Sequence, residues 1–411
     1  MKKLQNANRQ TNAKIAKENR SKKRGSKNKW YNKAWGHITH WWRGMPKWLR
    51  VQVPVFVTMG VLALSSLVTI IAMPNMGQDI IGENSGNTKS GWAKHTVAPF
   101  VDMTSWVNPS STYSINGASD VGEFANSTGL KYFCLGFINP VQTNPVSSDG
   151  TINWAWGGFA GLGKGSTSTQ YQGIVQSIKN LSDKGGMYVV SVGGQAGNAP
   201  WKVSQNKDKL VDFYLDIIDT YKIKRLDLDI EESNQDADHN QINANAIKKV
   251  QDKTGVEIVL TLPIMPSGWQ QKQIDIIKAY LNSGVKISMI NSMCMCYGTG
   301  VWANEDYGDA SIRAIENSIK QMQDLFSSYG IPLTEQQAYA KTGCTVSIGY
   351  ESSLYPTFTT DMMKKVAAHA KQHNYGMLSF WSMGRDSTID GNKGINSAYA
   401  YTKICQSYLE K

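Results

Sequence analysis

The stretch RLDLDIEES, residues 225 to 233, places a carboxylate at every second position, with leucine or isoleucine between them. The acids are Asp227, Asp229 and Glu231. Successive side chains of a β-strand point to opposite faces, so the three acids share one face and the apolar residues share the other. Crowded and buried carboxylates raise one another's pKa, and a general acid at neutral pH needs a carboxyl that keeps its proton.

Two other interpretations of this stretch stay open on its pattern alone. An antiparallel strand with a solvated acidic face has the same alternation of polar and apolar residues. A divalent metal site is the second, because Asp-x-Asp supplies the oxygen ligands that hard cations prefer. The surrounding sequence has to decide between these interpretations.

Eight short apolar or β-branched runs follow one another along residues 95–411, separated by segments whose apolar residues recur at helical spacing. This alternation predicts an α/β protein, a (β/α)8 TIM barrel, with a doubly wound open sheet as the second possibility. In a barrel the acidic face points inward, and Glu231 lies at the C-terminal end of its strand, where barrel enzymes keep their chemistry. The eight predicted strands are 97–104, 132–138, 187–194, 225–231, 257–264, 287–295, 342–349 and 375–383.

The excess positive charge of the 411-residue chain, +11 in total, is confined to its beginning. Residues 1–50 hold 15 Lys and Arg against one acid, and the rest holds 28 basic against 31 acidic residues, so a nucleic-acid partner is not expected. Residues 51–73 are 23 uncharged, mostly apolar residues, enough for a transmembrane helix. A cleaved signal peptide is the alternative, but its apolar run is usually only about 7–15 residues long.

These features predict four regions in the chain. Residues 1–50 are a basic cytoplasmic tail, 51–73 a single-pass membrane anchor, 74–94 a flexible linker, and 95–411 the (β/α)8 barrel, which lies outside the cell. The orientation follows from the positive charges, which stay on the cytoplasmic side. We therefore expect a protein of the cell membrane whose N-terminus is cytoplasmic.

Other candidate chemistry in the sequence is weak. The segment 157–166 nearly spells a phosphate-binding loop but has Gly165 where Ser or Thr is needed. His369 and His373 have metal-ligand spacing without a third ligand, and the cysteines are an odd number scattered through apolar runs. We therefore predict neither a metal nor a cofactor. The five cysteines are Cys134, Cys294, Cys296, Cys344 and Cys405.

Several segments resemble glycoside hydrolase family 18, the chitinases and endo-β-N-acetylglucosaminidases. DLDIE resembles the D-x-D-x-E end of that family's signature, and SVGG, residues 191–194, resembles its S-x-G-G motif. Further segments are similar to the bacterial chitinase-like branch, so the resemblance covers about residues 95–390. They are VAPFVDMTSW, TLPIMPSGW, NSMCMCYG and MLSFWSMGRD.

The resemblance implies a retaining hydrolysis in which the substrate's own acetamido group acts as the nucleophile. Glu231 is then the general acid and later the base. Asp229 holds the acetamido N–H, Asp227 tunes the charge of Asp229, and Tyr297 hydrogen-bonds the acetamido oxygen. The implied substrate has β-1,4-linked N-acetylglucosamine, with chitin fragments first and N-glycan cores or peptidoglycan-derived glycans second.

The substrate-binding residues follow from the same placement. Trp381, at the end of the eighth predicted strand, is expected to form the floor under the sugar. Trp154 and Trp156 lie in the loop at the barrel mouth and are candidate sugar platforms. The matched motifs add Met295, Gly193 and Gly194 to the expected binding residues.

The chain departs from the family pattern at two places. Lys224 and Arg225 replace the first Asp and the Gly of the long signature, and Cys296 stands where the sixth strand of this branch has an Asp. The lost carboxylate favours the alternative function, a catalytically inactive chitinase-like lectin at the cell surface. Retained Glu231 favours the enzyme.

Overall fold

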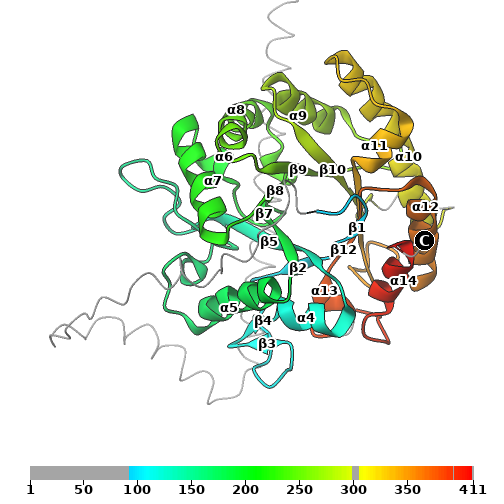
Figure 1. Ribbon diagram of the computed structural model, residues 1–411, viewed down its shortest axis with the longest axis horizontal. Coiled ribbons are helices and arrows are strands. Elements are labelled where there is room, and N and C mark those ends of the chain that lie inside the picture. The colour runs from blue at the N-terminus through cyan, green and yellow to red at the C-terminus, as the bar shows by residue number, and fades with distance from the viewer. Residues whose placement is uncertain (1–91, 299–304, 392, 410–411) are drawn as a thin grey trace, which may run out of the picture. The chain divides into compact units, whose positions relative to one another are not determined.

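The computed structural model describes residues 92–298, 305–391 and 393–409, and a closed barrel of parallel strands lies at their centre (Figure 1). The strands pair in the order β1-β12-β11-β10-β9-β8-β7-β5-β2. Their bounds are β1 (Thr96–Val97), β2 (Phe100–Asp102), β5 (Tyr132–Pro140), β7 (Met187–Gly193), β8 (Arg225–Asp229), β9 (Glu257–Pro263), β10 (Ile287–Cys294), β11 (Thr342–Ser347) and β12 (Met377–Trp381).

The barrel is closed by β1 and β2, which are two pieces of one strand. Thr96 of β1 pairs with Met377 of β12, and Phe100 of β2 pairs with Cys134 of β5. Between the pieces lies Pro99, which has no N–H to give to a ladder. Counting them as one, the barrel has the eight strands predicted from the sequence, each beginning within three residues of its expected start, and the open doubly wound sheet is excluded.

A ring of helices surrounds the barrel (Figure 1). Side-chain caps define several helix starts, such as Ser168, which accepts from the Tyr171 N–H, and Asp236, which accepts from the His239 N–H. The helices are α4 (Val121–Thr128), α5 (Thr169–Asp183), α6 (Pro200–Val203), α7 (Lys207–Tyr221), α8 (Ala237–Thr254), α9 (Gln271–Asn282), α10 (Tyr307–Ser328), α11 (Glu335–Ala340), α12 (Thr360–His373), α13 (Met383–Asp386) and α14 (Ala400–Leu409).

Short elements extend the loops between strands and helices. An antiparallel strand, β6, pairs with the end of β5, and β3 pairs with β4 to form a small hairpin. Their bounds are β3 (Ser114–Ile115), β4 (Ala118–Ser119), β6 (Trp154–Trp156), and the 3-10 helices η1 (Ala160–Leu162) and η2 (Glu232–Asn234).

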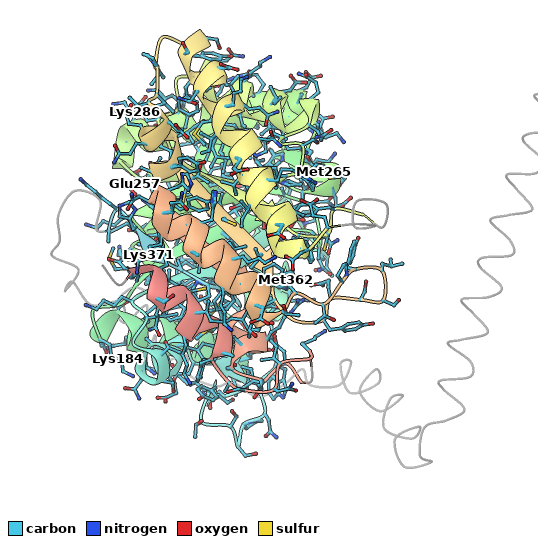
Figure 2. The ribbon with its side chains drawn as sticks, turned by 90° about the vertical axis from the view of Figure 1, so that its right-hand side faces the viewer. Lys184, Glu257, Met265, Lys286, Met362 and Lys371 are labelled. Atoms are coloured by element: carbon cyan, nitrogen blue, oxygen red, sulfur yellow. The ribbon has the colours of Figure 1, made fainter. Side chains whose placement is uncertain are left out.

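The acidic strand lies with its faces as the alternation predicts. Leu226, Leu228 and Ile230 are fully buried in the main core, which also contains apolar residues of the surrounding helices. Asp227 and Asp229 are buried as well, with carboxylates toward the barrel interior. Figure 2 shows the two ends of the barrel through β9: Glu257, which begins that strand, and Met265, which follows it, lie at opposite ends.

A second apolar cluster fills the barrel near the N-terminal ends of its strands, and Trp92 belongs to it. The Trp92 ring lies 4.9 Å from the Tyr132 ring, and the Arg225 guanidinium lies 4.6 Å from its centroid. The segment 74–94 was predicted to be a flexible linker, and of it only residues 92–94 are described. The predicted boundary between linker and barrel, after residue 94, is wrong, because Trp92 is buried in the barrel.

Both ends of the described domain meet at Tyr375, just before β12. His95 Nδ1 lies 2.8 Å from the Tyr375 carbonyl oxygen, and the Tyr408 hydroxyl donates to that same oxygen. Tyr375 precedes β12, so this junction lies at the N-terminal end of the barrel.

The predicted tail 1–50, the predicted anchor 51–73 and most of the predicted linker lie outside the described residues. Among the helices of residues 92–298, 305–391 and 393–409, none is both long and apolar enough to cross a bilayer.

Candidate active site

A cavity of about 430 Å³ opens at the C-terminal end of the barrel. Its lining combines four aromatic side chains with three glutamates. The aromatic lining residues include Phe100, Phe137, Trp381 and Tyr355, the acidic ones are Asp229, Glu231, Glu232 and Glu351, and the rest are Gln195, Thr261, Pro263, Ile264, Met265, Met293, Met295, Cys296, Thr345 and Ser352. An apolar wall beside acids is suited to a pyranose ring, which has apolar C–H faces and polar edges.

Asp227 is held below the cavity by two hydroxyl groups. Its carboxylate accepts from Ser191 Oγ at 2.5 Å and from Thr261 Oγ1 at 2.6 Å. The Thr261 hydroxyl accepts from Asn291 Nδ2 at 3.0 Å, so neighbouring strands are joined across the barrel interior. Burial raises the pKa of Asp227 to about 6, and the hydrogen bonds from Ser191 and Thr261 limit that rise.

Asp229 lies one pleat closer to the cavity and is also buried. Its Oδ1 has no hydrogen-bond partner among the described residues. Burial, and then the charges of Glu231 and Asp227, raise its pKa well above the usual range. A buried oxygen without a partner is costly for the fold, and here it points to a ligand that would supply an N–H or O–H.

Glu231 follows β8 and is partly buried in the cavity wall. Burial, and then the charge of its neighbour Glu232, raise the pKa of Glu231 to about 7. At neutral pH the carboxyl group of Glu231 is therefore protonated in a large fraction of the molecules. This is the state that a general acid needs in order to give a proton to a leaving group.

Gly193 and Gly194 lie against Asp229 rather than among the cavity-lining residues. A Cβ on Gly193 would come within 2.1 Å of the Asp229 carbonyl oxygen, and its φ is +115°. The Gly194 N–H donates to that oxygen at 3.0 Å. The two glycines therefore allow the end of β7 to approach the acidic strand, which is a positioning role and differs from the sugar contact we expected.

Trp381 and Met295 both lie where they were expected, at the cavity wall. The Trp381 ring is stacked on the Phe137 ring, with centroids 5.7 Å apart and planes inclined by 22°. Phe100 lies beside it at 6.3 Å. These contacts hold the indole in one orientation, which suits a flat platform for a sugar.

The expected hydrogen bond from Tyr297 to the acetamido oxygen is wrong, because Tyr297 does not line the cavity. Its ring is buried in the core 5.6 Å from the Tyr307 ring, and its hydroxyl donates to Ser311 Oγ at 3.2 Å. Both partners belong to α10. The reason is local: Cys296 has φ +54°, and the chain turns there so that Cys296 opens into the cavity and Tyr297 packs against α10.

Trp154 and Trp156 are likewise not sugar platforms, because both are buried. Trp154 Nε1 donates to Asp216 Oδ2 at 2.8 Å, and Trp156 Nε1 donates to the Tyr221 hydroxyl at 2.8 Å. Both acceptors are on α7. Pairing of β6 with β5 turns these indoles into the core, and the exposed aromatic residue of the same insertion is Phe159.

Glu351 is the principal site residue that the sequence did not indicate. It lies in the loop after β11, far along the chain from the acidic strand, and its carboxylate lines the cavity. The only sequence signal that could have found it is its place just after the seventh predicted strand. Tyr355 and Glu232 were missed in the same way.

Comparison with known proteins gives a consistent result, although no protein-family model matches the chain. The chain is 31% identical over 318 residues to the "Probable bifunctional chitinase/lysozyme" of Escherichia coli (strain K12), which is 74% of this chain and 32% of that protein. It is 30% identical over 319 residues to "Endochitinase 11" of Metarhizium anisopliae, which is 74% of this chain and 55% of that protein. The chain therefore spans only a third to about half the length of these relatives.

A solved structure agrees with the relatives. The catalytic domain of a hyperthermophilic chitinase from Pyrococcus furiosus is 25% identical, with a TM-score of 0.62, covering 78% of this chain and 96% of that one. That domain therefore corresponds to nearly all of the barrel described above. The chain belongs to the chitinase family, glycoside hydrolase family 18.

Proposed function

We propose that the barrel hydrolyses β-1,4 linkages next to N-acetylglucosamine in chito-oligosaccharides, with retention of configuration. The observation that carries this proposal is the carboxyl group of Glu231, which lines the cavity and has a pKa raised to about 7. The names of the similar proteins, a chitinase/lysozyme and an endochitinase, support the choice of glycan.

The first chemical step uses Glu231 and the substrate's own acetamido group. Glu231 gives its proton to the glycosidic oxygen while the bond from that oxygen to C1 breaks. The acetamido carbonyl oxygen forms a new bond to C1 from the opposite face and gives an oxazolinium ion. Asp229 Oδ1, which is buried and has no partner in the described part of the chain, accepts the acetamido N–H, and a protonated carboxyl can still do so through its carbonyl oxygen.

The second step returns the proton. Glu231, now ionised, takes a proton from water as the oxygen of that water attacks C1 and opens the oxazolinium ring. Asp227 stays fixed by Ser191 and Thr261, and its charge contributes to the raised pKa of Asp229. Trp381 lies under the sugar, since its indole is held against Phe137 in the cavity wall.

The pH dependence of turnover by the full chain tests this proposal. Because the protonated form of Glu231 is the active one, kcat/KM for a fluorogenic chitobioside should fall as pH rises through about 7. The fall should approach tenfold per pH unit above that value. A rate that rises across the same range would contradict the assignment of Glu231 as the acid.

A sugar-binding protein without turnover is the second candidate, and Cys296 is the observation that favours it. Its thiol opens into the cavity where the family resemblance leads us to expect a carboxylate. Binding of chitotetraose without turnover at any pH from 5 to 8 would favour this candidate. Release of a β-anomer, followed by proton NMR, would support the retaining enzyme instead.

We also propose that residues 51–73 anchor the protein in the cell membrane, with the N-terminus cytoplasmic and the barrel outside. The support is the length and lack of charge of this run and the basic residues before it. The mass of the protein extracted from membranes with detergent should be that of the full chain, 45.5 kDa. Loss of residues 1–73 would contradict the anchor and indicate cleavage.

A further inference from the structure

Cys296, two residues after the sixth strand, β10, lines the cavity where the family resemblance leads us to expect a carboxylate. Partial burial and the nearby charges of Glu351 and Glu231 raise the pKa of its thiol to about 11. A protonated thiol is a weak donor and a weak acceptor, so it is a poor substitute for a carboxylate in binding a sugar hydroxyl. Glu351 and Cys296 line the same cavity.

Glu351 brings a fixed carboxylate to the same cavity. Arg385 Nη1 donates to Glu351 Oε2 at 2.6 Å, and the Ser347 hydroxyl donates to the same oxygen. Arg385 is only 6% exposed. Burial alone would raise the pKa of Glu351, but the hydrogen bonds from Arg385 and Ser347 outweigh it and the pKa is lowered. The carboxylate is therefore ionised at neutral pH.

These hydrogen bonds leave one oxygen of the Glu351 carboxylate, Oε1, to accept from a ligand. Those from the described residues reach Oε2, and the side chain as a whole lines the cavity. Arg385 also donates to Ser347 Oγ at 2.8 Å and to the Ile348 carbonyl oxygen at 3.4 Å, so Glu351 is one of several acceptors for this arginine. A carboxylate that is oriented by a buried arginine and open on one side is suited to accept from a ligand hydroxyl.

We propose that Glu351 is a substrate-binding residue that takes the place of the missing sixth-strand carboxylate and accepts a hydrogen bond from a hydroxyl group of the bound N-acetylglucosamine unit. This inference rests on the proposed function only in its choice of ligand. The loop after β11 thereby supplies a contact that β10 no longer supplies. Glu351 orients the sugar, while proton transfer stays with Glu231.

Binding of chitotetraose, measured by calorimetry in the full chain, tests this assignment without requiring turnover. The parent protein carries Glu231→Gln, so that the ligand is not cleaved. Adding Glu351→Gln should weaken binding by about 10- to 100-fold, because a hydrogen bond to a charged acceptor is lost. Adding Cys296→Asp to that double variant should recover a large part of the affinity, since it returns a carboxylate to the lining of the same cavity.

Two further variants separate binding from folding. Glu257→Gln is the matched control, because Glu257 is also paired to an arginine, Arg225 at 2.6 Å, but lies at the end of the barrel away from Met265 (Figure 2). It should leave the affinity unchanged. Glu351→Asp keeps the charge for Arg385 while withdrawing it from the cavity, so it should weaken binding with an unchanged melting temperature.

Unchanged affinity after both Glu351 substitutions would overturn the assignment, as would equal weakening by Glu257→Gln or absence of binding by the parent protein. Failure of the proposed function is a separate result. It would appear as binding of chitotetraose by the wild type without turnover, and the Glu351 variants would still be informative there.

Discussion

Replacing Glu231 with glutamine is expected to lower kcat for a fluorogenic chitobioside by about 100- to 10,000-fold, the range contributed by a general acid. Glutamine has nearly the same shape but cannot transfer a proton to the glycosidic oxygen. Because the side chain is partly buried and its pKa is raised by that burial, replacement by a neutral group should not destabilise the fold. KM should change much less than kcat.

Glu232 provides the control for this substitution, because it is the adjacent residue and also lines the cavity. Its charge contributes to the raised pKa of Glu231. Glu232→Gln should therefore keep turnover at pH 5 and move the alkaline limb of the pH profile to lower pH. An inactive Glu232→Gln protein beside an active Glu231→Gln protein would assign the acid to Glu232 instead.

Replacing Asp229 with asparagine is expected to lower kcat by about 100-fold or more and to raise the melting temperature at pH 8. The activity falls because the amide stays neutral, whereas the carboxyl group can ionise as the positively charged oxazolinium ion forms and stabilise that ion. The asparagine variant is the more stable protein at high pH because the fold raises the pKa of Asp229. In the wild type, Asp229 contributes stability below its unfolded pKa, and this contribution is lost as pH rises through the folded pKa. The wild type therefore loses stability progressively as pH rises above the unfolded pKa of Asp229, and asparagine has none to lose.

The difference in melting temperature between wild type and Asp229→Asn, measured at pH 5 and pH 8, checks the sign. The gain should be larger at pH 8 and about 2 °C or more. Asp149→Asn is a control of opposite sign, because hydrogen bonds with Thr151 lower the pKa of this exposed aspartate. A lower melting temperature for Asp229→Asn at pH 8 would sink the claim that its charge is unfavourable in the fold.

The strands of the barrel could be predicted from the sequence because each is buried on both sides. Parallel strands covered by helices need continuous apolar runs, and the acidic strand departs from this rule only on its inward face. Burial of Leu226, Leu228 and Ile230 requires Asp227 and Asp229 to point inward. The alternation of acidic and apolar residues in this strand therefore determines both the packing of the core and the position of the acidic side chains of the site.

The residues at strand ends could not be predicted in this way. A single left-handed residue, Cys296, redirects the side chain that follows it and sends Tyr297 into the core. Trp154 and Trp156 lie in a long insertion, and the pairing of β6 with β5, which buries them, has no distinct signal in the sequence. Glu351 follows a different strand from Glu231, and only the closed barrel brings the two residues to one cavity. The position of Glu351 therefore depends on the three-dimensional structure rather than on any local pattern.

The meeting of His95 and Tyr408 at Tyr375 bears on how the barrel can be combined with other parts. Both ends of the described domain lie at the side where the barrel strands begin, while the cavity opens where the strands finish. A segment joined to either end is therefore attached on the side away from the cavity mouth, and the proposed glycan substrate can enter without passing the attachment points. The same geometry allows this barrel to be carried within longer polypeptides with the cavity entrance unobstructed.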